Sequence, residues 1–141
     1  SAASDVYKRQ GLIDGDLEGN GYFHSKWSAP VLDANYGNYI DIKIGKTLHS
    51  LSFDYWTRKQ NGNGAPRSIR LFVSDDGSSW RKLKDINKGL PSNGNTKYSS
   101  AIFTDEEGFS YVRFAVLVSA AGDMTNSYAY FNLHELTFYG E

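Results

Sequence analysis

The sequence predicts an all-β fold, a sandwich of about eight antiparallel strands. The main signal is an alternation of apolar and polar residues, which places every second side chain on the same face of a strand. Clusters of Gly, Asn, Asp and Ser separate the alternating segments and are typical of turns. No segment shows the 3.6-residue period of an amphipathic helix. The length of 141 residues suits one domain with one core.

Five segments carry the alternation clearly. Their apolar positions are Ile40, Ile42 and Ile44; Leu51, Phe53 and Tyr55; Ile69, Leu71 and Val73; Val112, Phe114, Val116 and Val118; and Leu136 and Phe138. Two weaker strands are expected over Trp80–Ile86 and Lys97–Phe103. The run Ser74–Ser79 contains Asp-Gly and predicts a tight hairpin, with Trp80 packed across it. Residues 1–10 show little apolar pattern and are either an edge strand or a segment foreign to the domain.

Composition excludes several classes of function. The formal net charge is −1 and the isoelectric point is about 6.3, so neither a nucleic-acid surface nor a polybasic membrane patch is expected. The absence of cysteine excludes disulfides and thiolate chemistry. No apolar run approaches the ~20 residues of a membrane span, and no signal peptide is recognised. We expect that a signal peptide was removed or that the chain is one module of a larger protein.

The motifs of common enzymes are also missing. No two of the histidines His24, His49 and His134 stand at a metal-ligand spacing, and there is no HExxH motif. No GxSxG elbow accompanies them. Glu106 and Glu107 follow Asp105 in a polar turn, which indicates a solvated surface instead of an acid–base pair. The sequence therefore predicts a protein that is not an enzyme.

A carboxylate-bearing loop near the N-terminus is the candidate metal site. Asp14 and Asp16 imitate the start of an EF-hand loop, but position 12 of that loop is Ser25, where a bidentate Glu is required. Two interpretations stay open: the two aspartates cap a turn, or they belong to a different calcium site. In the second case Glu135, at the start of the last predicted strand, could supply a distant carboxylate.

Taken in order, the motifs resemble those of discoidin domains, also called coagulation factor 5/8 type C domains. The resemblance covers about residues 12–140 and is closest to bacterial family 32 carbohydrate-binding modules. The matching segments are Leu12–Asp16, Tyr22–Trp27, Tyr39–Gly45, Tyr55–Arg58, Ser74–Trp80, Tyr111–Phe114 and Glu135–Gly140. It implies a discoidin-like jelly-roll sandwich over residues 1–141.

The resemblance also implies one structural calcium ion. The family's aspartate and glutamate ligands match Asp14 and Glu135, and carbonyl ligands match Gly11, Asp16 and His134. The family's threonine falls near Asn20 or Gly21, so a hydroxyl ligand is missing or replaced here.

In sugar-binding members of the family, loops at one end of the sandwich hold the ligand. Aromatic rings stack on the sugar while Arg and Asn hydrogen-bond its hydroxyls. The candidate residues here are Trp27, Tyr36, Trp56, Arg58, Gln60, Asn61, Asn63, Asn126 and Tyr128. Trp27 and Trp56 could instead fill the core.

The resulting expectation is a carbohydrate-binding module of an exported bacterial glycan-processing or adhesive protein. The ligand would be a galactose- or N-acetylhexosamine-type glycan, bound weakly by a monomeric module that is secreted, periplasmic or on the cell surface. The alternatives are an adhesion domain that binds proteins or cell surfaces, and a spacer without a ligand. Membrane insertion is not expected, because the loop tip at Ala29–Leu32 is only modestly apolar and that at Asn61–Gly64 is polar.

Overall fold

The computed structural model of the protein describes residues 23–24, 38–58, 64–120, 122, 131–133 and 135–141. Within these residues there is no helix, and all strand pairs are antiparallel. The strands are β1 (Phe23–His24), β2 (Asn38–Trp56), β3 (Pro66–Ser74), β4 (Arg81–Ile86), β5 (Lys97–Ser99), β6 (Phe103–Ser119), β7 (Asn132–Leu133) and β8 (Glu135–Gly140). In this part of the chain no helix is long and apolar enough to cross a membrane.

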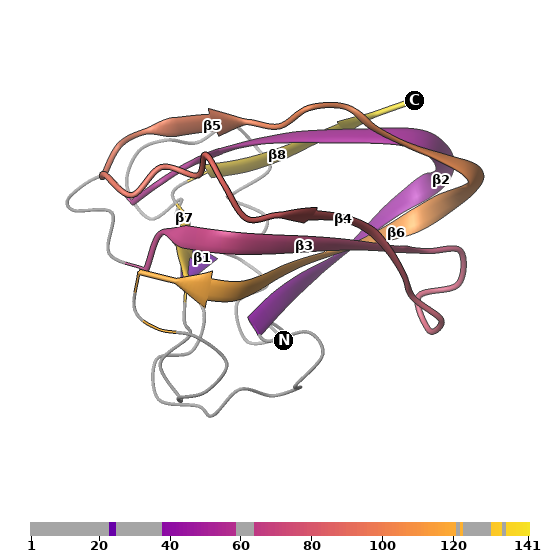
Figure 1. Cartoon of the computed structure of the whole chain (residues 1–141). Helices are drawn as coiled ribbons and strands as arrows, with labels where there is room; N and C mark the ends of the chain where they lie inside the picture. Colours follow the sequence, from indigo (N-terminus) through magenta and orange to yellow (C-terminus); the bar gives the residue numbers. More distant parts are fainter. Residues whose placement is uncertain (1–22, 25–37, 59–63, 121, 123–130, 134) are drawn as a thin grey trace.

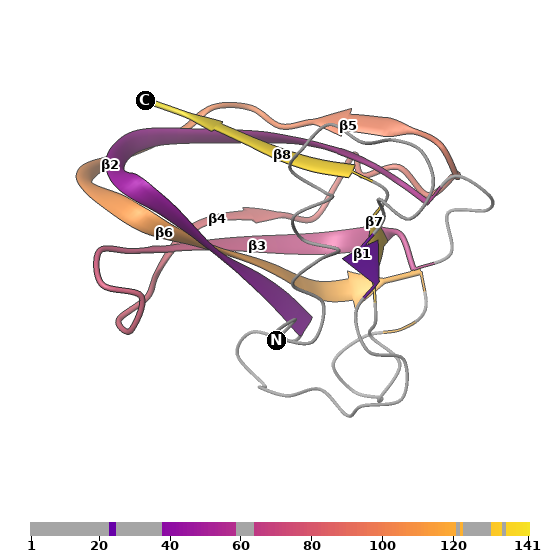
Figure 2. The same ribbon diagram turned by 180° about the vertical axis from the view of Figure 1, so that it is seen from behind.

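Most of the strands belong to one sheet that folds over on itself. Five strands follow the order β4-β3-β6-β2-β5, and β8 pairs with β2. Figures 1 and 2 show the resulting two layers, with β5, β8 and the second half of β2 in one and β3, β4 and the first half of β2 in the other. The short strands β1 and β7 pair separately, with Phe23 opposite Leu133. The sandwich is thus built largely from one continuous sheet.

The long strands β2 and β6 pass between the layers by bending together. The register of β2 against β6 shifts between Lys43 and Leu48, which marks an irregular stretch. Gly108 lies in the facing part of β6 with a φ of +87°, and a Cβ atom there would lie only 2.8 Å from Thr47 Cγ2. Because glycine alone combines this conformation with this lack of space, Gly108 lets the two bends pack closely.

The core lies between the layers and contains many aromatic rings. Phe53 and Phe114 meet edge to face with ring centroids 5.4 Å apart, and Tyr55 lies 6.2 Å from Phe53. Burial is the first cause that raises the pKa of Tyr55 above its ordinary value. The largest fully buried side chains are Tyr55, Phe53, Phe109, Phe114, Phe131, Ile40, Leu51, Ile69, Leu71 and Leu133. Large flat rings bury much apolar surface, so this cluster is the main source of cohesion between the layers.

Side-chain hydrogen bonds fix the hairpin between β3 and β4. Asp76 Oδ1 accepts hydrogen bonds from the backbone N–H groups of Ser78 and Ser79, and Ser74 Oγ accepts one from Gly77 N. The bonds from Ser79 and Ser78 lower the pKa of Asp76. Asp-Gly therefore closes this reversal as the sequence predicts.

The predicted all-β sandwich is confirmed, but two strand assignments were wrong. The segments around Ile40–Ile44 and Leu51–Tyr55 form one bent strand, β2, instead of two. The weaker strand predicted over Lys97–Phe103 is divided, because β5 ends at Ser99 and Phe103 begins β6. Both errors arise where pairing with distant strands, which local patterns do not report, decides whether the chain stays extended.

Candidate functional site

The candidate site lies at the end of the sandwich away from the bend. Trp56 ends β2 and is paired with Lys97 of β5 and Glu135 of β8. In the other layer Pro66, at the start of β3, is paired with Ser119 at the end of β6. Figure 1 shows these strand ends gathered at the left of the molecule, with the bend at the right. Connections that leave this end can converge on one ligand while the strands stay committed to the core.

Trp56 and Arg58 lie on the outer face of this end. Tyr55 and Thr57 are fully buried, whereas Trp56 and Arg58 are partly exposed. This alternation is that of a strand, in which neighbouring side chains point to opposite faces. Tyr55 therefore takes the core position, and the alternative that Trp56 fills the core is wrong. An aromatic ring and a guanidinium group are thus presented two residues apart on one surface.

Buried hydrogen bonds of Thr57 hold this segment in place. Thr57 N donates to Thr96 O at 2.9 Å, and Thr57 Oγ1 accepts from Thr96 N at 2.9 Å. The same hydroxyl donates to the carbonyl of Asn93, and Arg58 O accepts from Asn95 N at 3.0 Å. Since a buried hydrogen-bonded hydroxyl resists displacement, Arg58 starts its loop from a fixed backbone position.

The far end of the same loop is fixed by Gly64. Its carbonyl accepts a hydrogen bond from Asn132 N of β7 at 2.9 Å. Gly64 has a φ of +72°, and a Cβ atom there would lie 2.8 Å from Asn132 Nδ2. The next residue, Ala65, is buried and accepts a hydrogen bond from Ala120 N at 2.9 Å. The loop that carries the predicted polar residues is therefore held at both ends.

Two polar residues beside Arg58 were not predicted from the sequence. Asn93 and Asn95 are exposed and lie in the turn whose backbone bonds Thr57 and Arg58. Asn95 has a φ of +52°, a conformation that asparagine tolerates better than most residues. From the sequence, the run Asn93-Gly94-Asn95 indicates only a turn. Its place beside a loop more than thirty residues away depends on tertiary structure.

Most predicted ligand-binding residues lie outside the described part of the chain. Of the predicted set, the structure describes only Trp56 and Arg58 and brings them to one end of the sandwich. The others are Trp27, Tyr36, Gln60, Asn61, Asn63, Asn126 and Tyr128. These residues stay predictions.

The predicted calcium ligands lie almost entirely outside the described residues as well. Glu135 begins β8 opposite Trp56, which places its backbone at the same end of β2 as the candidate site. The remaining predicted ligands, Gly11, Asp14, Asp16 and His134, are not among the described residues. The described part alone contains no group of three or more His, Cys, Asp or Glu residues that could hold a metal ion.

Besides Asp76 of the hairpin, two described carboxylates, Asp105 and Asp85, have a lowered pKa, and both belong to ion pairs, at the opposite end and on the flank. Asp105 accepts two hydrogen bonds from Arg81, which lower its pKa, and its side chain is 14% exposed. The pKa of Asp85 is lowered first by its hydrogen bond with Arg70. His49 Nδ1 lies 3.3 Å from the carbonyl of Asp105. Each pairing satisfies the carboxylate, and none sets a proton donor beside a nucleophile in a closed site.

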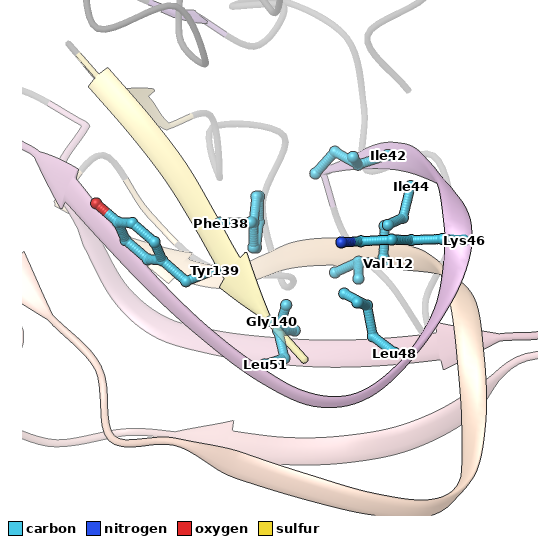
Figure 3. Close-up of a pocket in the computed structure, with 9 residues that line it drawn as sticks. All are labelled: Ile42, Ile44, Lys46, Leu48, Leu51, Val112, Phe138, Tyr139 and Gly140. Carbon is cyan, nitrogen blue, oxygen red and sulfur yellow. The ribbon is translucent and has the colours of Figure 1, made fainter.

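An apolar groove of about 380 Å³ lies near the bend, between β8 and the first half of β2. Figure 3 shows Phe138 and Ile42 on opposite sides of it, with Lys46 extended across the opening. Its remaining lining residues are Ile44, Leu48, Leu51, Val112, Tyr139 and Gly140. Because one ammonium group is its main polar feature, it does not suit a ligand rich in hydroxyls.

The comparison with family models shows to which protein family the chain belongs. Residues 1–132 match the model of the F5/8 type C domain. The chain belongs to this family. The family is the one that the order of the sequence motifs indicated, so that resemblance is confirmed. No curated protein sequence matches this discoidin domain.

Solved structures support the discoidin fold. CBM32-3 from a family 31 glycoside hydrolase of Clostridium perfringens has a TM-score of 0.69 and 24% identity, covering 94% of this chain and 82% of its own. CpGH89CBM32-5 from Clostridium perfringens, solved with GalNAc-β-1,3-galactose, has a TM-score of 0.66 and 20% identity, with coverages of 93% and 82%. The C-terminal domain of a chitobiase from Bacteroides fragilis has a TM-score of 0.64 and 16% identity, with coverages of 100% and 87%. At these identities the likeness establishes the fold.

Proposed function

We propose that this discoidin domain is a non-catalytic carbohydrate-binding module whose glycan docks at the end of the sandwich that carries Trp56 and Arg58. The observation that carries the proposal is the outward placement of these two side chains on a backbone that Thr57 anchors. An aromatic ring can cover the C–H face of a sugar, and a guanidinium group can donate to neighbouring hydroxyls. Asn93 and Asn95 are exposed, and their backbones bond Thr57 and Arg58, so their amides are further candidate donors and acceptors.

The related structures support a proposal on the class of ligand and of parent protein. CpGH89CBM32-5 was solved with a disaccharide of N-acetylgalactosamine and galactose, and CBM32-3 comes from a glycoside hydrolase. We therefore propose a galactose- or N-acetylhexosamine-type glycan and a role in targeting an exported bacterial enzyme or adhesin. Sugar hydroxyls exchange water bonds for protein bonds with little net gain. The expected dissociation constant lies between about 1 µM and 1 mM, or about −8 to −4 kcal/mol.

The test is a glycan array followed by calorimetry with Arg58→Ala and Lys43→Ala. Each variant removes one positive charge, but Lys43 is exposed on the first half of β2, in the other layer. Loss of binding in Arg58→Ala, with retention in Lys43→Ala and unchanged melting of both, supports the proposal. Silence of all glycans would favour an adhesion domain for proteins or a spacer. Equal binding by both variants would indicate that the glycan binds to another face of the domain.

We also propose a structural calcium ion held by Asp14 and Glu135 with carbonyl oxygens of Gly11, Asp16 and His134. A hard cation takes six to eight oxygen ligands, and two carboxylates with three carbonyls supply most of them. Glu135 starts β8, so an ion held there would tie the N-terminal loop to a strand of the main sheet. Its part would be structural, since calcium supplies no group that acts on a sugar in this proposal.

A further inference from the structure

A second groove lies on the flank of the sandwich, where the two outer strands of the folded sheet meet. β4 and β5 stand at opposite ends of the strand order β4-β3-β6-β2-β5. Because the sheet folds over, their free edges face each other, and Figure 1 shows β5 in the layer above β4. The groove between them has a volume of about 400 Å³, and its lining comes from the end of β4, the turn after it, β5 and the start of β6. Trp56 and Arg58 do not line it, and only Tyr98 comes from β5, the strand that also reaches the Arg58 end.

Aromatic residues form the floor of this flank groove. Tyr98 and Phe103 line it, and both are half-buried against the core. The Tyr98 ring centroid lies 5.4 Å from that of Tyr55 and 5.9 Å from that of Phe53. Core contacts thus hold the Tyr98 ring in position while part of it faces the groove. A ring fixed in this way can accept the apolar face of a sugar without a large loss of side-chain entropy.

The rim of the groove has an excess of positive charge. Lys84 and Lys88 are exposed, and neither has a carboxylate partner within the described residues. Asp85, the acidic residue of the lining, is already paired with Arg70 at 2.5 Å and Lys82 at 3.0 Å. Two ammonium groups therefore remain for an anion. A carboxylate placed between them would complement the charge of this rim.

A hydrogen-bond donor stands between the two lysines in sequence. Asn87 also lines the groove, and its Oδ1 accepts a hydrogen bond from Ser68 Oγ at 2.6 Å. This bond sets the orientation of the amide and leaves the two hydrogens of Nδ2 as donors. A ligand hydroxyl next to a ligand carboxylate could accept a hydrogen bond from these donors.

We propose that the flank groove is a second saccharide site, which takes a uronic acid or another sugar that carries a carboxylate. The sugar ring lies against Tyr98 and Phe103, its carboxylate faces Lys84 and Lys88, and Asn87 donates to a hydroxyl. Exposed ion pairs are weak and screened by salt, so binding is millimolar and weakens as the ionic strength rises. The site would let the module distinguish acidic glycans from neutral ones.

The test is an amide NMR titration of the whole chain with cellobiouronic acid and with cellobiose, which differ in one carboxylate. We expect the acidic disaccharide to shift the amides of residues 84–88 and 98–103 at concentrations up to ~20 mM, and cellobiose to leave them unchanged. The double variant Lys84→Gln/Lys88→Gln should bind the acidic sugar about fivefold more weakly. Lys43→Gln/Lys46→Gln is the matched control. It removes the same charge from two exposed lysines of β2 that do not line the flank groove, and this variant should bind the acidic sugar normally.

Each other result overturns the proposal. Equal shifts with both disaccharides would show that the lysines do not select the ligand. Equal weakening in both double variants would indicate a long-range effect of net charge. The same shifts with tetraglutamate would show an anion site without recognition of the sugar. Shifts confined to Trp56 and Arg58 would support the proposed glycan face and contradict the flank site, so the two proposals fail separately.

Discussion

Arg113 Nε and Nη2 donate two hydrogen bonds to the carboxylate of Asp41, at 2.7 and 2.9 Å. The two residues face each other across β6 and β2. The guanidinium carbon also lies 4.1 Å from the ring centroid of Tyr39 and 4.2 Å from that of Trp80, which follows the β3–β4 hairpin. One side chain thus joins β2, β6 and the hairpin on the outside of the sheet, where the core gives no support.

Replacement of Arg113 should destabilise the fold more than its position on the outer face suggests. Arg113→Ala removes two charge-assisted hydrogen bonds and two ring contacts, so we expect the free energy of unfolding to fall by about 2–3 kcal/mol. Arg113→Lys keeps the charge but not the fork and should lose about 1 kcal/mol. Urea denaturation measures both. The control Arg67→Ala, at an exposed position of β3, should stay within ~0.5 kcal/mol, and an equal loss there would contradict this account.

The Arg81–Asp105 pair should make stability depend on acid pH. Its hydrogen bonds lower the pKa of Asp105 in the folded chain, so ionisation favours folding. The contribution is complete above the unfolded value of about 3.9 and is lost as the pH falls through the folded value. Asp105→Asn should lower the free energy of unfolding by roughly 1–2 kcal/mol at pH 7 and flatten its decline below about pH 4. Denaturation at several pH values tests this, with the exposed Glu106→Gln as the control. An unchanged acid decline in Asp105→Asn would rule the pair out as its cause.

Gly64→Ala should disturb the loop that begins at Arg58. The new Cβ would meet Asn132 Nδ2 at 2.8 Å and Asn132 N at 3.1 Å, in addition to the strain of the positive φ. We expect a loss of about 2–3 kcal/mol in the free energy of unfolding and weaker glycan binding. Gly89 has a φ of +77° but open space around it, so Gly89→Ala isolates the conformational cost of about 1 kcal/mol. Similar losses in the two variants would show that contact with Asn132 is unimportant.

Removal of calcium should lower the melting temperature. An ion that binds only the folded state stabilises it by about 2.7 kcal/mol at a hundredfold excess over its dissociation constant. Asp14→Ala should abolish the response to chelator, whereas Glu106→Ala should keep it. Differential scanning calorimetry with and without chelator gives the answer. A melting curve that chelator leaves unchanged, in protein shown by elemental analysis to hold calcium, would disprove the site.

The sequence predicted which strand residues face the core better than it predicted where the strands begin and end. The alternation of Leu51, Phe53 and Tyr55 marks a buried face, and all three are fully buried. The bend after Lys43 was not predictable, because the residues there stay within β2 between the pairs Lys43–Tyr111 and Leu48–Phe109, whose β6 partners lie more than sixty residues away. Local propensity cannot report such a partner.

Adjacent aromatic residues posed the same problem at the candidate site. Tyr55 and Trp56 are neighbours, and composition alone did not say which of them enters the core. The pairing of β2 with β8, in which Tyr55 lies opposite Leu136, fixes the register and turns Trp56 outward. Asn95 was missed for a related reason, since its position depends on a backbone bond to Arg58 across tertiary structure.

β2 pairs with β6 along one edge and with β8 along the other, and this arrangement affects how the chain folds. Leu51 pairs with Phe103 on one side and with Gly140 on the other, so the middle strand is completed only by residues far along the chain. Such high contact order slows folding to the range of milliseconds to seconds. During synthesis one hydrogen-bonding edge of β2 stays unpaired until β8 has left the ribosome, and until then that edge is open to misassociation. The sheet is therefore completed only by the last strand of the domain to be synthesised.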